Sequence, residues 1–145
     1  MNFIIRELNL NANDIEGIHN LNLQLGFDFP KEKLKSRLEY LVNNFETKIF
    51  VAEHNYKVIA YIHGSESDRI YDDRLFFIHT LVVDEEYRSK GIGNRLIAEI
   101  EEWVSVNNYL GIGLWSRIDR VDAHKFYEKH GYLNERTQKY YLKYF

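Results

Sequence analysis

The 145-residue sequence contains no cysteine, a single proline and a single methionine. Without cysteine there is no disulfide framework, no thiolate metal site and no cysteine nucleophile. No apolar run approaches the ~20 residues that a membrane-spanning helix needs. The N-terminus lacks a basic segment followed by a long apolar stretch, so it does not read as a signal peptide. The six histidines show no metal-ligand spacing such as His-Glu-x-x-His, so no metal is expected. These absences predict a soluble cytoplasmic protein with no membrane partner.

The sequence does contain enough apolar material for one core. It is 45% hydrophobic and 15% aromatic, in a length typical of one domain. No internal repeat, low-complexity tract or linker is visible, so we expect a single domain over residues 1–145. The net charge of −3 and the lack of a basic stripe argue against a nucleic-acid-binding protein.

The first half of the chain predicts a strand at 3–8 and then two helices. Asparagines cap the first helix and Gly26 ends it, while Pro30 suits the first turn of the second. The two buried stripes are expected to be Ile15, Ile18, Leu21 and Leu25, then Leu34, Leu38, Leu41, Val42 and Phe45.

A β-rich half follows. Strands are predicted at 47–53 and 56–64, with a tight hairpin between them, and a polar loop at 65–74 carries four acidic residues. The apolar run 75–83 predicts a central strand, whose alternation places His79 on one face with Phe77, Leu81 and Val83. A helix to about Asn107, a strand at 109–116, a helix between Asp119 and Gly131, and two closing strands within 132–145 complete the pattern.

A glycine-rich corner, Arg88-Ser89-Lys90-Gly91-Ile92-Gly93, joins the central strand to the next helix. Unpaired backbone N–H groups and the positive end of the helix dipole make such a corner an anion site. Arg88 and Lys90 add two positive charges, which suits a pyrophosphate. No Gly-Lys-Ser/Thr follows, which excludes a P-loop, and Leu96 stands at the third glycine position of the dinucleotide fingerprint.

Arg88-x-x-Gly91-x-Gly93 after a strand ending in Val83 resembles the acetyl-CoA pyrophosphate loop of the GCN5-related N-acetyltransferase (GNAT) superfamily. The segment from Ala123 to Tyr132 resembles the family's Ala-x-x-Phe/Leu-Tyr-x-x-x-Gly-Phe/Tyr pattern. The resemblance implies an α+β (α/β) fold with a central mixed, mostly antiparallel sheet of six to seven strands and about four helices. Its element order is strand, two helices, three strands, helix, strand, helix and two strands.

The resemblance also implies an N-acetyltransferase that moves the acetyl group of acetyl-CoA to a primary amine of a small, cationic acceptor by direct transfer in a ternary complex. Dimerisation is common in the family, and the aromatic tail is compatible with a homodimer. Arg120 stands where many members carry a pantetheine-contacting asparagine, which weakens that one assignment. The implied cofactor-binding residues are Leu81, Val82, Val83, Arg88, Ser89, Lys90, Gly91, Ile92, Gly93, Asn94, Ser116, Arg120, His124 and Tyr127.

Tyr127 occupies the family's tyrosine position in the last helix, which implies that it protonates the departing thiolate. Three candidates remain open for the general base: His79, Glu53 at a strand end, and a water chain to solvent, with His63 and His124 behind them. The alternatives to a small-molecule enzyme are a protein or peptide N-acetyltransferase and a non-catalytic acyl-CoA-binding module. Tyr127 together with a titratable strand residue favours the enzyme.

Overall fold

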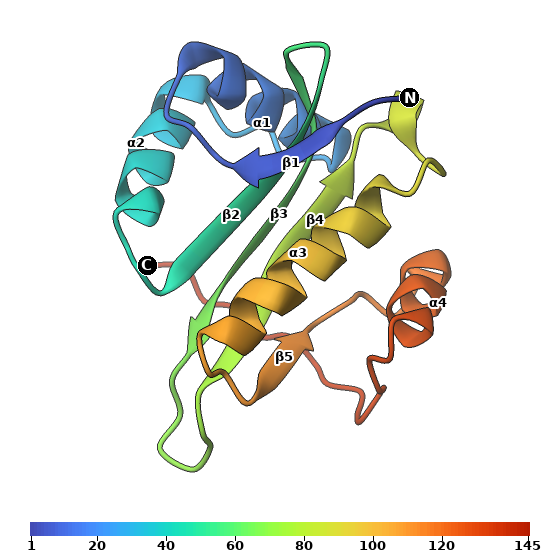
Figure 1. The fold of residues 1–145 in the computed structure, drawn as a ribbon. Helices are drawn as coiled ribbons and strands as arrows, with labels where there is room; N and C mark the ends of the chain where they lie inside the picture. Colours follow the sequence, from blue (N-terminus) through green and yellow to red (C-terminus); the bar gives the residue numbers. More distant parts are fainter. The chain divides into compact units, whose positions relative to one another are not determined.

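A computed structural model describes all of residues 1–145, which form two compact units, Met1–Leu114 and Trp115–Phe145 (Figure 1). The first unit holds every strand and three of the α-helices, and the second holds the last helix. The elements are β1 (Ile4–Glu7), α1 (Ala12–Gln24), α2 (Lys31–Val42), β2 (Thr47–His54), β3 (Lys57–Ser67), β4 (Leu75–Val83), the short 3₁₀ helix η1 (Glu85–Tyr87), α3 (Ile92–Val106), β5 (Gly111–Leu114) and α4 (Val121–Lys129).

The five strands form one sheet in the order β1-β2-β3-β4-β5. The first three pairings are antiparallel and β4 pairs with β5 in parallel, so the predicted mixed, mostly antiparallel sheet is confirmed. Helices α1 and α2 cover one face and α3 crosses the other (Figure 1). Apolar side chains of α1 and α2 form the core of their face with Ile49, Val51, Tyr61 and Val82 of the sheet.

The boundaries of α1 and α2 follow local signals closely, with one difference at the end of α2. The side chain of Asn11 accepts a hydrogen bond from the backbone N–H of Asp14, and Gly26 ends α1 with φ of 91°. Helix α2 stops at Val42, so the predicted stripe is too long: Phe45 lies beyond the helix and is 86% exposed. Helical spacing carries no information about where the backbone leaves the helix.

The two predicted closing strands are absent, and the sheet therefore has five strands rather than six or seven. Residues 132–145 contain no strand, and the tail tyrosines Tyr140, Tyr141 and Tyr144 are at least 83% exposed. Aromatic residues favour strands only where a neighbouring strand supplies backbone partners and a surface to pack on. The β-propensity of this tail was therefore misleading.

The start of the second unit also differs in detail from the prediction. Strand β5 covers only 111–114, instead of 109–116. The N-cap residue of α4 is Arg120 and no side chain caps it, whereas Asp119 accepts a hydrogen bond from Arg117 at 3.0 Å. Asp119 forms this local ion pair in place of the predicted cap.

Strand β4 contains a β-bulge. On β3, His63 pairs with Thr80 and the next residue, Gly64, pairs with Ile78, so His79 is an extra residue in the ladder. A Cβ atom on Gly64 would lie 2.3 Å from Cε1 of Phe76. Only glycine allows the two strands to approach this closely, which places the bulge at this position.

The bulge makes the predicted face assignment of β4 wrong. Phe77 pairs with Ser65 before the bulge, and Val82 pairs with Tyr61 after it. Because directly paired residues share a face, Phe77 and Val82 point to the α1/α2 side, although five positions separate them. Leu81 pairs with Ile62 and points to the opposite side, so it does not share the face of Phe77.

Candidate active site

The edge of β4 opens where its pairing with β5 ends. Parallel pairing runs from Leu75 with Gly111 to Ile78 with Leu114 and goes no further. Beyond Ile78, β4 pairs with a strand only on its β3 side. The predicted pantetheine segment, Leu81 to Val83, lies within this half-open stretch, whose free edge suits an extended chain that carries amide groups.

The glycine-rich corner lies directly after that open stretch. Helix α3 begins at Ile92, its N-cap Gly91 has φ of 81°, and no side chain caps it. Ser89 also has a positive φ, of 62°. Left-handed residues in a turn before a helix aim successive backbone N–H groups into one concavity, which is the geometry that binds phosphate. Residues 88–91 are exposed, whereas the Ile92 side chain is buried and offers only its backbone.

Buried polar contacts hold the corner against the sheet. Asp84, which is 6% exposed, donates its backbone N–H to the carbonyl of Ile59 at 2.8 Å. Arg88 donates through Nε to the carbonyl of Val83 at 3.2 Å, so its side chain folds back over the end of β4. The predicted phosphate residues Arg88 to Gly93 are thus brought together with the open strand edge at Leu81 to Val83.

His79 lies at the level where β4 and β5 part. Its Nε2 is 2.5 Å from Oγ of Ser65, and its ring centroid is 5.2 Å from that of His63. Nε2 of His63 is buried and has no hydrogen-bond partner. Burial, followed by the nearby His79 and Arg37, lowers the pKa of His63 to about 4, and burial also lowers the pKa of His79. Both rings are neutral at pH 7, and the low pKa of His63 leaves His79 as the better proton acceptor of the two.

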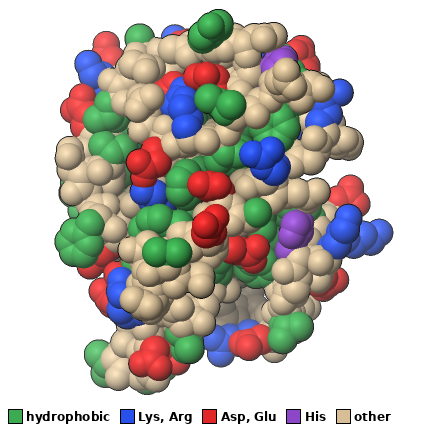
Figure 2. Space-filling view, in the orientation of Figure 1, with side chains coloured by type: hydrophobic (Ala, Val, Ile, Leu, Met, Phe, Trp, Pro, Cys, Tyr) green, Lys and Arg blue, Asp and Glu red, His purple; other side chains and the backbone are tan.

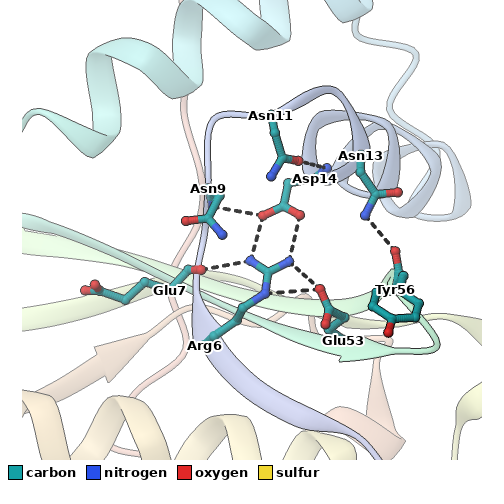
Figure 3. Close-up of polar contacts among 8 residues, drawn as sticks. All are labelled: Arg6, Glu7, Asn9, Asn11, Asn13, Asp14, Glu53 and Tyr56. Atoms are coloured by element: carbon teal, nitrogen blue, oxygen red, sulfur yellow. Dashed lines mark hydrogen bonds and ion pairs between the residues drawn. The ribbon is translucent and has the colours of Figure 1, made fainter.

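Glu53, the other side-chain candidate for the base, belongs to a separate ionic cluster (Figure 3). Arg6 of β1 binds the fully buried carboxylate of Asp14 through two hydrogen bonds of 2.8 Å and also donates to Glu53 at 2.8 Å. The backbone N–H of Asn9 adds a further bond to Asp14. Glu53 is thus paired with Arg6 inside this cluster.

The second unit carries the remaining predicted cofactor contacts. Ser116 has a buried hydroxyl without a hydrogen-bond partner, and Arg120 is the N-cap residue of α4. A ring nitrogen of His124, Nε2, lies 2.8 Å from the carbonyl of Arg117, which ties this histidine to the turn before the helix.

Tyr127 is packed among aromatic rings of the same unit. Its ring centroid lies 5.3 Å from that of Phe126 and 5.8 Å from that of Tyr132. Burial raises the pKa of Tyr127, and the positive charge of Arg120 opposes this. The phenol is therefore firmly protonated at neutral pH, as a proton donor has to be.

Two of the four acidic residues predicted for the loop at 65–74 are paired with arginines, and one of these, Glu66, lies in β3, which runs to Ser67. Glu66 accepts a hydrogen bond from Arg74 at 2.9 Å, and Asp72 pairs with Arg69 at 3.2 Å. These two carboxylates are thus less available to attract a cationic acceptor. A shallow hollow of about 560 Å³ lies elsewhere, along α2, and includes neither His79 nor β4; its lining is Phe29, Glu32, Lys33, Ser36, Arg37 and Tyr40.

Sequence reasoning missed Ser65 and the contact between His63 and His79. The available signal was Gly64, because a glycine inside a strand pattern often marks a bulge. The sequence did not show which strand residues that bulge brings together, since β3 and β4 contribute one histidine each.

The face drawn in Figure 2 has no single dominant charged or apolar patch, because acidic, basic and apolar side chains are interspersed on it. None of the helices is long and apolar enough to cross a membrane. No three histidine, cysteine or acidic side chains come together as a set of metal ligands.

Comparison with known proteins identifies the family of this chain. Residues 15–132 match the model of the acetyltransferase (GNAT) family. An uncharacterized N-acetyltransferase of Methanocaldococcus jannaschii is 27% identical over 124 residues, which are 81% of this chain and 55% of that protein. The chain spans between about a third and about half of the length of the curated relatives that it matches.

Two solved structures show the same fold. Glucosamine-6-phosphate N-acetyltransferase from Arabidopsis thaliana superposes with a TM-score of 0.84 at 23% identity, over 100% of this chain and 99% of that one. An aminoglycoside N-acetyltransferase in complex with CoA gives 0.86 at 18% identity, over 98% and 95%. Since the family model covers most of the sequence and includes both the glycine corner and α4, the chain belongs to the GNAT acetyltransferase family.

Proposed function

We propose that this protein transfers the acetyl group of acetyl-CoA to a primary amine of a small acceptor. The observation that carries the proposal is the juxtaposition of the uncapped α3 N-terminus with the open edge of β4 beyond Ile78. The α3 N-terminus offers backbone N–H groups to a pyrophosphate, and the open edge of β4 offers strand backbone to an arm that carries amide groups. When bound, acetyl-CoA supplies the activated acetyl thioester.

The glycine corner leaves room for that cofactor. A Cβ atom on Gly91 would meet no atom within 4 Å, so the space above the corner is open. Backbone groups of Arg88 to Asn94 hold the phosphates in our proposal, with the charges of Arg88 and Lys90 beside them. Leu81 to Val83 bind the pantetheine arm, and a backbone N–H at Leu81 or Val82 polarises the thioester carbonyl.

His79 is the base in this proposal. It is neutral at pH 7 and lies beside the open strand edge, whereas Glu53 is held by Arg6. His79 takes the proton that the acceptor ammonium must lose before its nitrogen can attack. Tyr127 donates a proton to the departing thiolate, an assignment that rests on its place in the α4 sequence pattern. Ser116, Arg120 and His124 of the second unit remain proposed contacts to the cofactor.

The acceptor in our proposal is a small amine rather than a protein. Among the solved structures with this fold is an aminoglycoside N-acetyltransferase, which supports an amine-rich, cationic acceptor. The paired carboxylates of Glu66 and Asp72 provide no strong attraction for such a charge. The panel used to find the acceptor should therefore include cationic, neutral and acidic amines.

Calorimetric titration with acetyl-CoA, followed by measurement of free thiol over that panel, tests the proposal. We expect saturable binding and thiol release that depends on one class of amine. His79→Gln should bind acetyl-CoA normally and lose most of the turnover. Binding without amine-dependent release over the panel would favour the acyl-CoA-binding module, and failure to bind would refute the assignment of the corner.

A further inference from the structure

The β-bulge brings together three polar side chains that the family pattern does not predict. Ser65 and His63 come from β3, and His79 is the extra residue of β4. Nε2 of His79 lies 2.5 Å from Oγ of Ser65, and the two imidazole rings are 5.2 Å apart. We call Ser65, His63 and His79 the bulge cluster.

A hydrogen bond between a hydroxyl and an imidazole nitrogen can run in either direction, and the direction decides what His79 can do. If Ser65 donates, Nε2 is occupied as an acceptor, Nδ1 carries the hydrogen, and no lone pair of the ring remains for a substrate proton. If Nε2–H donates to Oγ, the lone pair of Nδ1 is free. Only the second arrangement is compatible with a base.

We propose that Ser65 is a positioning residue that accepts a hydrogen bond from Nε2–H of His79 and thereby leaves Nδ1 as the proton acceptor. This inference rests on the proposed role of His79 as base. The proton balance is simple: the acceptor ammonium loses one proton, Nδ1 gains it, and the resulting imidazolium keeps its Nε2–H bond to Ser65. Orientation of a base by a third group is a recurrent device in enzymes.

His63 supports this arrangement by staying uncharged. Its Nε2 is buried without a partner, and burial holds its pKa at about 4. A neutral neighbour at 5.2 Å does not oppose the transient positive charge on His79. Polar and charged groups near the cluster include Thr47 on β2, which pairs with Ser65, Tyr61 on β3, Thr80 on β4, Arg37 on α2, and Arg69, whose guanidinium lies 5.1 Å from the Phe77 ring.

Nuclear magnetic resonance of the imidazole nitrogens tests the proposal without any activity measurement. In the ¹⁵N-labelled protein at pH 7.5, His79 is identified by the signals that disappear in His79→Gln. We expect the Nε2–H tautomer with an Nε2 proton protected from solvent exchange. In Ser65→Ala that proton should exchange about tenfold faster, the loss expected for one hydrogen bond.

Two variants separate positioning from general damage. Ser65→Thr keeps the hydroxyl and should restore the protected proton. Ser67→Ala makes the same substitution two residues along β3 and should leave the His79 signals unchanged. Thermal unfolding of each variant identifies any that fails to fold.

Activity provides a second readout. Ser65→Ala should lower kcat about tenfold with little change in KM for acetyl-CoA, and Ser65→Thr should recover most of it. An Nδ1–H tautomer in the wild type, or an Nε2 proton equally protected in Ser65→Ala, would overturn the inference. If no amine is acetylated at all, the proposed function fails, whereas the nitrogen signals still decide the direction of the bond.

Discussion

At the residue scale, His63 makes the stability of the protein depend on pH. The pKa of this histidine falls from 6.5 to about 4 on folding, so between those values the unfolded chain binds more protons than the folded chain. The contribution of His63 therefore leaves the free energy of unfolding at its full value above pH 6.5 and lowers it as the pH falls towards 4.

We therefore expect His63→Gln to flatten the pH dependence of stability. The free energy of unfolding falls between pH 7 and pH 4, and this fall should be smaller in the variant than in the wild type by up to about 3 kcal/mol. Urea unfolding at a series of pH values measures both curves. Parallel curves would show that His63 is not held neutral in the folded protein.

A second residue-scale feature is the buried carboxylate of Asp14 (Figure 3). Asp14→Asn leaves the guanidinium of Arg6 short of one charge partner in a largely buried site. We expect a loss of about 3 kcal/mol of unfolding free energy. Asp28→Asn, on the exposed link after α1, is the matched control and should change stability little.

The double variant Arg6→Met/Asp14→Leu removes both charges of the buried pair and should recover part of the stability that Asp14→Asn loses, while Glu53 and the Asn9 N–H lose their partners. Urea unfolding measures all three variants. If Asp14→Asn is no more destabilising than Asp28→Asn, the cluster does not stabilise the junction of β1, α1 and β2.

At the element scale, the effect of a negative charge at the turn into α3 can be separated from the effect of backbone strain at its glycine. Gly91 and Gly26 both have positive φ, of 81° and 91°, and a side chain on either would meet no atom within 4 Å. Gly91→Asp and Gly26→Asp should therefore share a similar backbone cost of about 1–2 kcal/mol.

Only Gly91→Asp places a negative charge in the proposed phosphate site. Calorimetry should show at least a tenfold loss of acetyl-CoA affinity for Gly91→Asp and little change for Gly26→Asp. Equal losses in the two variants would attribute the effect to general destabilisation rather than to the corner.

The bulge is the second element with a clear steric requirement. Gly64→Ala would bring Cβ to 2.3 Å from Cε1 of Phe76 and 2.6 Å from the carbonyl oxygen of Phe77. We expect a loss of more than about 2 kcal/mol and a shifted His79 signal. Gly111→Ala, where the nearest atom is Leu75 Cδ2 at 3.7 Å, should be nearly neutral.

Elements predicted correctly are those whose determinants are local. The apolar spacing of α3 and the glycine corner before it stand within one short stretch of sequence, and both occur as expected. Gly64 is a local hint of a bulge, but how it packs under Phe76 and where β5 stops depend on residues far away in the sequence. The contact between Arg6 and Glu53 joins residues 47 positions apart and was equally out of reach.

At the scale of the whole molecule, acetyl-CoA should stabilise the folded protein, because the proposed site exists only when β4, the corner and α3 are assembled. A ligand at one hundred times its Kd adds about 2.7 kcal/mol to the free energy of unfolding. The thermal midpoint should rise with acetyl-CoA concentration in the wild type and in Gly26→Asp. It should barely move in Gly91→Asp, and an equal rise in all three would place the ligand elsewhere.

The half-open edge of β4 also has a consequence for how the purified protein behaves. An unpaired run of strand backbone is a template on which a second chain can add a strand, and natural sheets usually protect such edges. Residues 80–83 pair with a strand on one side only. The stretch that we propose seats the cofactor is therefore also the place where aggregation would begin. Storage with CoA should slow the growth of light scattering at high protein concentration, so the cofactor would act as a solubilising agent as well as a substrate.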